Sequence, residues 1–312
     1  MGGVSGAVAQ LEHELVGPPD APVILALGGI SASRHVTGEG VGAPDGWWPA
    51  IAGRGRALDT RTRRVLGVEY LDGGRAPDGR PASLVTTHDQ AEAIVALLDQ
   101  LGIERLDAVV GASYGGMVAL ALAERWPGRV GRVVAISAAH ESTPMSTALR
   151  ALQRHIVELG LDTGSATQAM TLARALAMTT YRSAAELAVR FPVVPDVDGA
   201  TASFDVERYL LHAGAKFAAR TPPERFLALS LSADLHRVAP EAITVPVAVV
   251  AATGDTLVPA EATTTLASRL PNLLGHATLE SSVGHDAFLV EPGQLAAILS
   301  IVLADSDVSR LL

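Results

Sequence analysis

The sequence predicts an α/β protein with a mostly parallel β-sheet and helices on both of its faces. Two observations lead to this prediction. Short apolar runs alternate with amphipathic stretches along most of the chain, as in parallel strands joined by crossover helices. In addition, 48% of the 312 residues are hydrophobic, which is enough for one large domain with an insertion or for two modest domains.

The individual elements can be assigned in order along the chain. The predicted strands are Val23–Leu27, Arg64–Val68, Asp107–Val110, Val130–Ser137, Val245–Ala251 and His276–Leu279. The predicted helices are Thr87–Leu101, Met117–Arg125 and residues 294–304. Apolar residues recur at helical spacing in the first of these helices, and Pro127 with Gly128 ends the second.

The strand pattern disappears between residues 138 and 235. This region is helical in pattern and rich in Ala, Leu and Arg, with interruptions at 191–199 and 221–224. A helical insert between consecutive strands of one sheet is the simplest explanation, and such an insert commonly acts as a lid. We therefore expect residues 1–137 and 236–312 to form the core and residues 138–235 to form a helical lid.

Composition limits the partners and the compartment. The formal charge of −9 argues against nucleic acid or an anionic membrane surface as the main partner. The chain has no cysteine, which excludes disulfides, thiolate metal sites and a cysteine nucleophile. The N-terminal residues do not resemble a signal peptide, and no apolar run is long enough for a membrane span. We expect a cytoplasmic protein that binds small molecules.

The stretch G-A-S-Y-G, centred on Ser113, fits the pattern G-x-S-x-G. An apolar strand precedes it and a helical pattern follows it, which is the context that a nucleophile elbow requires. Small residues suit so sharp a turn, and the start of the following helix favours negative charge nearby. A purely structural glycine-rich turn is the alternative interpretation.

A serine hydroxyl needs a base, and that base needs a carboxylate to orient it. Asp255 lies just beyond the fifth predicted strand, and His285 lies just beyond the sixth. Both follow the carboxyl ends of strands, where open α/β sheets place their sites, and the order serine, acid, histidine is that of hydrolase-type triads. Taken singly, Asp255 could be a turn residue and His285 a surface histidine.

An acyl-transfer site also needs two backbone N–H groups to bind an oxyanion. We expect one from Tyr114, directly after the serine, and the other from Gly29 or Ile30 in the loop after the first strand. Gly28 and Gly29 could instead form a simple turn. The sequence holds no H-E-x-x-H motif and no close cluster of histidines and carboxylates, so we expect no metal site.

Several segments resemble the homoserine O-acyltransferases of the α/β-hydrolase superfamily, from about residue 23 to residue 300. The similar segments are L-G-G-I-S-A-S-R-H-V, G-A-S-Y-G-G-M-V-A-L, A-R-A-L-A-M-T-T-Y-R-S, F-D-V-E-R-Y-L-L-H-A-G-A-K-F and V-G-H-D-A-F-L. The segments with Y-R and G-H-D-A-F-L are more specific than the elbow because general esterases lack them. The segment before residue 20 is short for this family.

The resemblance implies a role for each site residue. Ser113 would be the nucleophile, Asp255 the orienting acid and His285 the base of a ping-pong reaction. Arg182 would bind the carboxylate of the amino-acid substrate and Asp286 its ammonium group. The acyl donor would be an acyl-CoA, with no metal or redox cofactor, and the protein would be a homodimer.

The acyl group of the implied reaction is either succinyl or acetyl. The L-G-G-I-S and G-A-S-Y-G forms look more like the succinyl-transferring branch than the acetyl-transferring branch. A succinyl group carries a second carboxylate, for which Arg150 and Arg154 are candidates, although both could be solvated helix charges. Transfer to serine or another hydroxy amino acid, and a plain esterase or thioesterase, are the alternative functions.

Overall fold

The computed structural model describes residues 11–39 and 43–304, and its centre is a seven-stranded sheet. The strand order is β1-β3-β2-β4-β5-β8-β9, and only β1 runs antiparallel to its neighbour. The strands are β1 (His13–Val16), β2 (Val23–Leu27), β3 (Arg64–Val68), β4 (Ala108–Ala112), β5 (Val133–Ile136), β8 (Val247–Ala252) and β9 (Leu273–Leu279). The predicted mostly parallel sheet is therefore confirmed.

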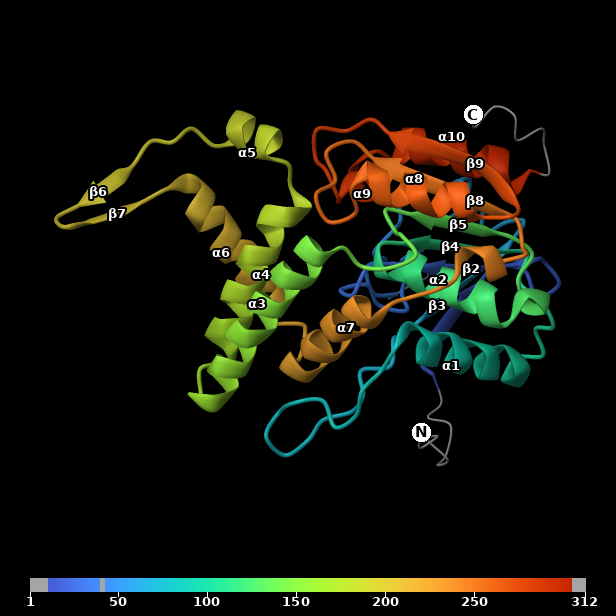
Figure 1. The fold of residues 1–312 in the computed structure, drawn as a ribbon, viewed down its shortest axis with the longest axis horizontal. Coiled ribbons are helices and arrows are strands. Elements are labelled where there is room, and N and C mark those ends of the chain that lie inside the picture. Colours follow the sequence, from blue (N-terminus) through green and yellow to red (C-terminus); the bar gives the residue numbers. More distant parts are fainter. Residues whose placement is uncertain (1–10, 40–42, 305–312) are drawn as a thin grey trace.

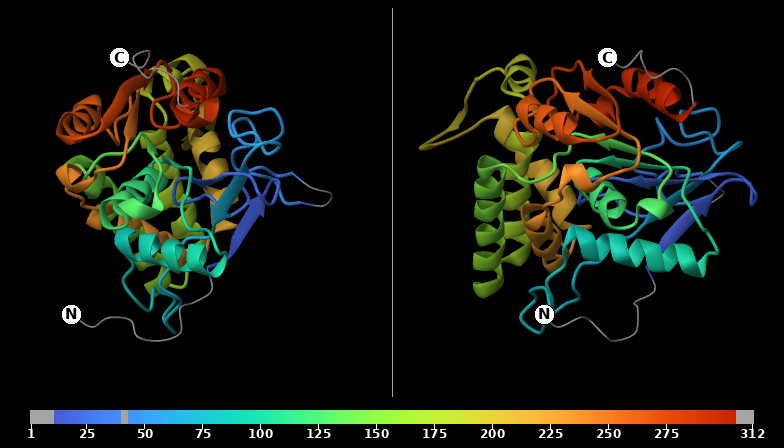
Figure 2. Two further views of the ribbon diagram at one scale, coloured as in Figure 1. Left: turned by 90° about the vertical axis from the view of Figure 1, so that its right-hand side faces the viewer. Right: turned by 45° about the vertical axis from the view of Figure 1, so that its right-hand side comes forward.

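Each face of the sheet has its own hydrophobic core. In β2, Leu25 and Leu27 face one core while Ile24 and Ala26 face the other, as the two-residue period of a strand requires. The first core is closed by α1 (Thr87–Gln100), α2 (Tyr114–Arg125) and α8 (Ala260–Arg269). The second is closed by α9 (Ala287–Val290), α10 (Pro292–Leu303) and the segment around Trp48. Helices thus cover both faces, as Figures 1 and 2 show.

Several strand bounds differ from the prediction by one to three positions, and one strand was not predicted at all. The edge strand β1 was not predicted, because its four residues mix charged and apolar side chains and all are only half-buried. Strand β9 begins at Leu273, three positions before the predicted start at His276. Its pairing with β8 already starts at Leu273, which lies opposite Val247. Ser113, Asp255 and His285 still follow the ends of β4, β8 and β9.

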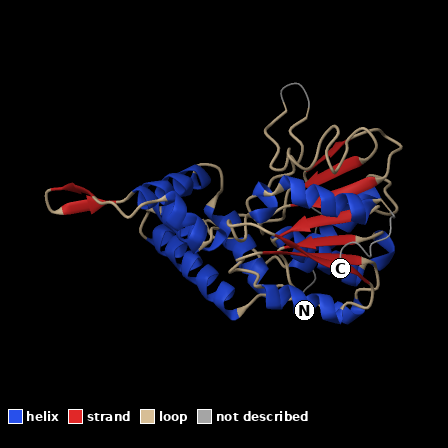
Figure 3. Cartoon of the chain, turned by 90° about the horizontal axis from the view of Figure 1, so that it is seen from above, coloured by secondary structure: helices blue, strands red, loops and turns tan. Residues whose placement is uncertain are grey.

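Between β5 and β8 the chain leaves the sheet and forms a bundle of helices beside it. The elements are α3 (Pro144–Asp162), α4 (Ala166–Tyr181), α5 (Ala184–Arg190), β6 (Asp196–Asp198), β7 (Thr201–Ser203), α6 (Asp205–Ala218) and α7 (Pro223–Leu235). Figure 3 shows this bundle next to the sheet, with the β6–β7 hairpin projecting from its far end. The hairpin lies where the sequence indicated only an interruption, and five of its six strand residues are exposed.

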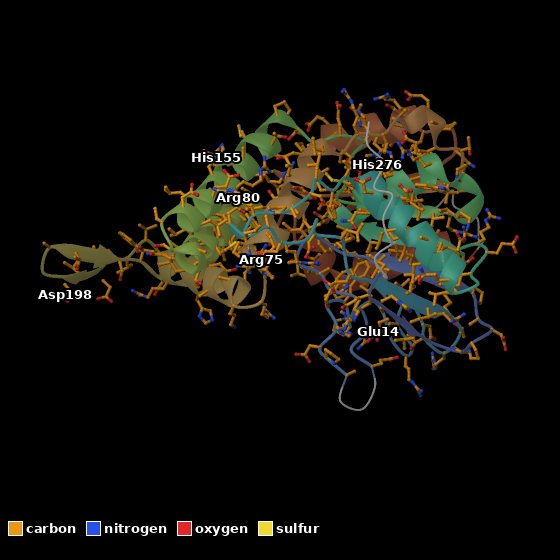
Figure 4. The ribbon with its side chains drawn as sticks, turned by 90° about the horizontal axis from the view of Figure 1, so that it is seen from below. Glu14, Arg75, Arg80, His155, Asp198 and His276 are labelled. Atoms are coloured by element: carbon orange, nitrogen blue, oxygen red, sulfur yellow. The ribbon has the colours of Figure 1, made fainter. Side chains whose placement is uncertain are left out.

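Small residues let the helices of the bundle approach closely. A Cβ atom at Gly160 of α3 would lie 2.2 Å from Ala169 of α4, and one at Gly214 of α6 would lie 2.2 Å from the carbonyl oxygen of Thr171. The bundle is tied to the core by a long loop that follows β3. Arg80 of that loop binds Asp162 of α3 at 2.8 Å, and Figure 4 shows Arg75 and Arg80 beside the bundle.

Candidate active site

Ser113 occupies a strained turn between β4 and α2. Its φ of 55° and ψ of −121° lie outside the regions that side-chain-bearing residues normally adopt. The turn is possible because Gly111 and Gly115 touch almost directly: a Cβ atom at Gly111 would lie 2.3 Å from the carbonyl oxygen of Gly115. The backbone N–H of Ser113 donates to Ile136 of β5 at 2.8 Å, which anchors the turn to the sheet. This is the geometry of a nucleophile elbow.

The structure brings Ser113, Asp255 and His285 together at the carboxyl ends of their strands. Nδ1 of His285 lies 2.7 Å from Oδ2 of Asp255, and Nε2 lies 2.8 Å from Oγ of Ser113. Because the ionised carboxylate can only accept, Nδ1 carries the proton and Nε2 is free to accept from the serine hydroxyl. The other carboxylate oxygen, Oδ1, accepts from the N–H groups of Leu257 and Val258, both at 2.9 Å.

The surroundings of His285 favour its protonated form. Burial by itself lowers the pKa of the imidazole, but the charge of Asp255 and the hydrogen bond to it act in the opposite direction, with a smaller contribution from Asp286. The net result is a pKa above the ordinary histidine value of 6.5. His285 is therefore a stronger base than a free imidazole, and it is held between acid and serine.

The predicted oxyanion donors line the space in front of the serine. Tyr114 begins α2, and a Cβ atom at Gly29 would lie 3.9 Å from Cβ of Ser113. The N–H groups of Gly29 and Ile30 donate no hydrogen bond to another described residue. Their loop is held by Tyr70, whose hydroxyl donates to the carbonyl oxygen of Gly28 at 2.7 Å and whose ring packs edge-on against Tyr114. Unpaired N–H groups beside the serine suit a developing oxyanion.

A cavity of about 190 Å³ opens in front of Ser113 and His285. Its walls come from the loop after β2, from α2, from the helical bundle and from the loop after β9. Besides Ser113, Tyr114 and His285, its lining includes Gly29, Ile30, Trp47, Arg150, Gln153, Arg174, Tyr181, Leu257, Asp286 and Phe288. Both the sheet and the bundle therefore contribute to the site.

Of the two residues that the resemblance implies for binding the amino-acid substrate, only one lines the cavity. Asp286 lines the cavity next to His285, and burial raises its pKa above the usual aspartate value. Arg182, by contrast, does not line the cavity. It follows the last turn of α4, where its Nε comes within 3.4 Å of Asp286 without making a hydrogen bond.

The guanidinium that does reach the cavity from α4 is Arg174, which the sequence analysis did not single out. It lies over the rings of Tyr181 and Phe217, with its central carbon 4.8 and 4.7 Å from their centroids. Arg174 and Arg182 stand in the same A-R-A-L-A-M-T-T-Y-R-S segment. The segment belongs to the helix that borders the cavity, and the packing of that helix places Arg174 rather than Arg182 in the cavity wall.

The structure also distinguishes the two arginines that the sequence offered for an acyl carboxylate. Both bind Asp234, but Arg150 lines the cavity and Arg154 does not.

Among the described residues, no group of three histidines or carboxylates is placed to hold a metal ion. Within the same residues, no helix has the length and hydrophobicity to cross a membrane.

Comparison with known proteins identifies the family. A model of the α/β-hydrolase fold matches residues 22–292. The homoserine O-succinyltransferase of Xanthomonas campestris is 43% identical over 94% of this chain and 79% of that protein. The homoserine O-acetyltransferase of Mycolicibacterium smegmatis is 35% identical over 88% of this chain and 81% of its own.

The solved structures agree with the fold. The homoserine O-acetyltransferase from Bacillus anthracis superposes with a TM-score of 0.86 over 95% of this chain and 92% of that one, at 18% identity. Esterase E22 superposes with a TM-score of 0.84 over 94% and 93% of the two chains, at 21% identity. At such low identity these two structures support the fold alone. The sequence relatives described above identify the family. This chain belongs to the homoserine O-acyltransferase family of the α/β-hydrolase fold.

Proposed function

We propose that this protein transfers an acyl group from an acyl-CoA to the hydroxyl of L-homoserine, with succinyl favoured over acetyl. The observation that carries the proposal is the pairing of a Ser113–His285–Asp255 hydrogen-bond chain with opposite charges, Arg174 and Asp286, in one cavity. An esterase needs the first feature but has no need of the second. The 43% identity to a homoserine O-succinyltransferase supports the choice of acceptor and of donor.

In the first half of the reaction, Ser113 becomes acylated. Its Oγ attacks the thioester carbonyl carbon while Nε2 of His285 takes the hydroxyl proton. The N–H groups of Tyr114 and of Gly29 or Ile30 bind the oxyanion. The C–S bond then breaks, and CoA leaves as the thiol after taking the proton from His285. Asp255 stabilises the imidazolium that exists between these two proton transfers.

In the second half, homoserine replaces CoA. Nε2 of His285 takes the proton of the substrate hydroxyl, whose oxygen attacks the acyl carbon of the Ser113 ester. When the ester bond to Ser113 breaks, Oγ regains its proton from His285 and the O-acyl amino acid leaves. The proposed reaction uses two substrates and no metal or redox cofactor.

The amino-acid end of the acceptor requires one cation and one anion side by side. Arg174 and Asp286 meet this requirement because both line the cavity. Burial raises the pKa of Asp286, and the charges of His285, Arg182 and Arg174, in decreasing order, lower it. We therefore assign the substrate carboxylate to Arg174 and the ammonium group to Asp286. Arg182, which the family resemblance suggested for the carboxylate, instead positions Asp286 from outside the cavity.

Acyl transfer also requires that water is kept from the acyl-enzyme. Residues of α3, α4 and α7 cover the cavity, in keeping with a lid role for residues 138–235.

The β6–β7 hairpin carries exposed Val197 and follows exposed Val193 and Val194, a suitable surface for a second copy of the chain. A homodimer and a cytoplasmic location remain predictions.

The decisive experiment measures free CoA and O-acyl product with succinyl-CoA or acetyl-CoA as donor. L-homoserine, L-serine and water serve as acceptors, and Ser113→Ala is the inactive control. We expect product with homoserine at a rate well above hydrolysis, and a loss of several orders of magnitude in Ser113→Ala. Release of CoA at equal rates with and without an amino acid would identify a hydrolase instead.

A further inference from the structure

The cavity contains a second guanidinium, Arg150, that the amino-acid end of the substrate does not use. Its Nε and Nη2 lie 2.7 and 2.6 Å from Oδ1 of Asp234, and Nη2 also donates to Oγ of Ser142 at 2.7 Å. Nη1 has no hydrogen-bond partner in the part of the chain that the structure describes. One edge of the guanidinium is therefore fixed, and the other is free to bind a ligand in the cavity.

The cluster around Arg150 carries one uncompensated positive charge. Nη1 of Arg154 binds the other oxygen of Asp234 at 2.6 Å, so two guanidinium groups share one carboxylate. The three side chains are 15%, 13% and 6% exposed in the order Arg150, Arg154 and Asp234. Because burial of an unpaired charge is costly, this arrangement favours the entry of an anion.

A second donor lies beside Arg150 on the same face of α3. Gln153 follows it by three positions, lines the cavity and is only 3% exposed. Its side-chain amide has no hydrogen-bond partner among residues 11–39 and 43–304, so its N–H groups are available. A free guanidinium edge next to a free amide donor is well suited to the two oxygens of a carboxylate.

We propose that Arg150 and Gln153 bind a carboxylate at the far end of the acyl chain. The donor is then the CoA thioester of a short dicarboxylic acid, of which succinyl-CoA is the probe to use. This inference rests on the proposed function, since it concerns the acyl group that Ser113 carries. An acetyl group has no charge to place here and would leave the excess charge of the cluster uncompensated.

Arg154 provides a matched control. Replacing either Arg150 or Arg154 by Met removes one arginine of α3 from Asp234 and leaves the other to pair with that carboxylate. The structural cost of the two variants is therefore similar, but only Arg150 lines the cavity. Urea unfolding of both variants verifies that they are folded to the same extent.

The measurement is the burst of free CoA from succinyl-CoA and from acetyl-CoA without any acceptor. In this step the Ser113 Oγ–acyl bond forms, the C–S bond breaks and CoA leaves as the thiol. We expect Arg150→Met to lower the ratio of the succinyl to the acetyl acylation rate by roughly 10- to 100-fold. Gln153→Leu lowers the ratio less, and Arg154→Met changes it by less than about threefold.

The outcomes separate this inference from the proposed function. An unchanged ratio in Arg150→Met, an equal change in Arg154→Met, or faster acylation of the unmodified protein by acetyl-CoA would overturn the carboxylate subsite. If the ratio depends on Arg150 but homoserine does not accept the acyl group, the subsite stands and the proposed acceptor is wrong. If neither thioester acylates Ser113, both proposals fail.

Discussion

Nε2 of His285 lies 2.8 Å from Oγ of Ser113, although 172 positions separate the two residues in the chain. The contact depends on the order of the strands. The elbow ends β4 in the middle of the sheet, and the chain then adds β5, the helical bundle, β8 and β9 before His285 follows. Since β4, β5, β8 and β9 are parallel neighbours, their carboxyl ends meet at one edge, and serine, acid and base converge there.

The pH dependence of acylation tests the state of His285. The base must be neutral. Burial lowers its pKa, but the charge of Asp255, the hydrogen bond to it and the charge of Asp286 together raise the pKa above the ordinary value. We expect kcat/KM for the acyl-CoA to fall as the pH decreases through a value above 6.5, the ordinary histidine pKa. In Asp255→Asn this limb moves to lower pH and kcat falls by about 10⁴-fold. An acid limb well below pH 6 in the unmodified protein would contradict the assignment.

The choice between Arg174 and Arg182 can be tested by separating the two half-reactions. We expect Arg174→Met to raise the KM for homoserine by roughly 10- to 100-fold, because it removes the ion partner of the substrate carboxylate. The CoA burst without acceptor is measured in the same variant as a reference for the first half-reaction. We expect Arg182→Met to raise the KM less, because its proposed role is to position Asp286, from which its Nε lies 3.4 Å. A larger effect in Arg182→Met would instead support the role of Arg182 that the family resemblance implies.

Local sequence patterns predict the buried strands and the elbow, whereas tertiary packing sets the features that the sequence does not reveal. The buried strands and the elbow are local patterns, since apolar runs and small residues around Ser113 are needed wherever that turn forms. The orientation of α4 is not local. Its packing against α3 and α6 through Gly160 and Gly214 decides that Arg174 faces the cavity. Half-buried β1 and the exposed β6–β7 hairpin lack the apolar pattern by which the other strands were found.

The elbow glycines make a prediction about stability. A Cβ atom at Gly115 would lie 2.3 Å from the carbonyl oxygen of Leu27 in β2, so α2 and the sheet would have to move apart. We expect Gly115→Ala to lower the free energy of unfolding by about 1–3 kcal/mol and to reduce acylation, because Ser113 moves with α2. Gly293→Ala in α10 is the control, since a Cβ atom there meets nothing within 4 Å. An equal effect of both changes in urea unfolding would contradict the close contact.

His236 is a buried histidine at the end of α7. Its Nδ1 accepts from the hydroxyl of Thr87 at 2.9 Å, and its Nε2 donates to the carbonyl oxygen of Ala139 at 3.2 Å. Burial lowers the pKa of His236 to about 3, and the hydrogen bond to Ala139 offsets only part of this effect. The folded protein therefore keeps this ring neutral at a pH where the unfolded chain protonates it.

It follows that stability falls as the pH decreases from about 6.5 towards 3, by up to roughly 4–5 kcal/mol from this residue. We expect His236→Gln to be less stable than the unmodified protein at pH 7.5 and to lose less stability between pH 7 and pH 4. Urea titrations across this range measure the slope. The control is His155→Gln, because the side chain of His155 is 75% exposed on α3 (Figure 4). If the unmodified protein and His236→Gln lose stability in parallel, His236 takes up its proton equally well in the folded and unfolded states.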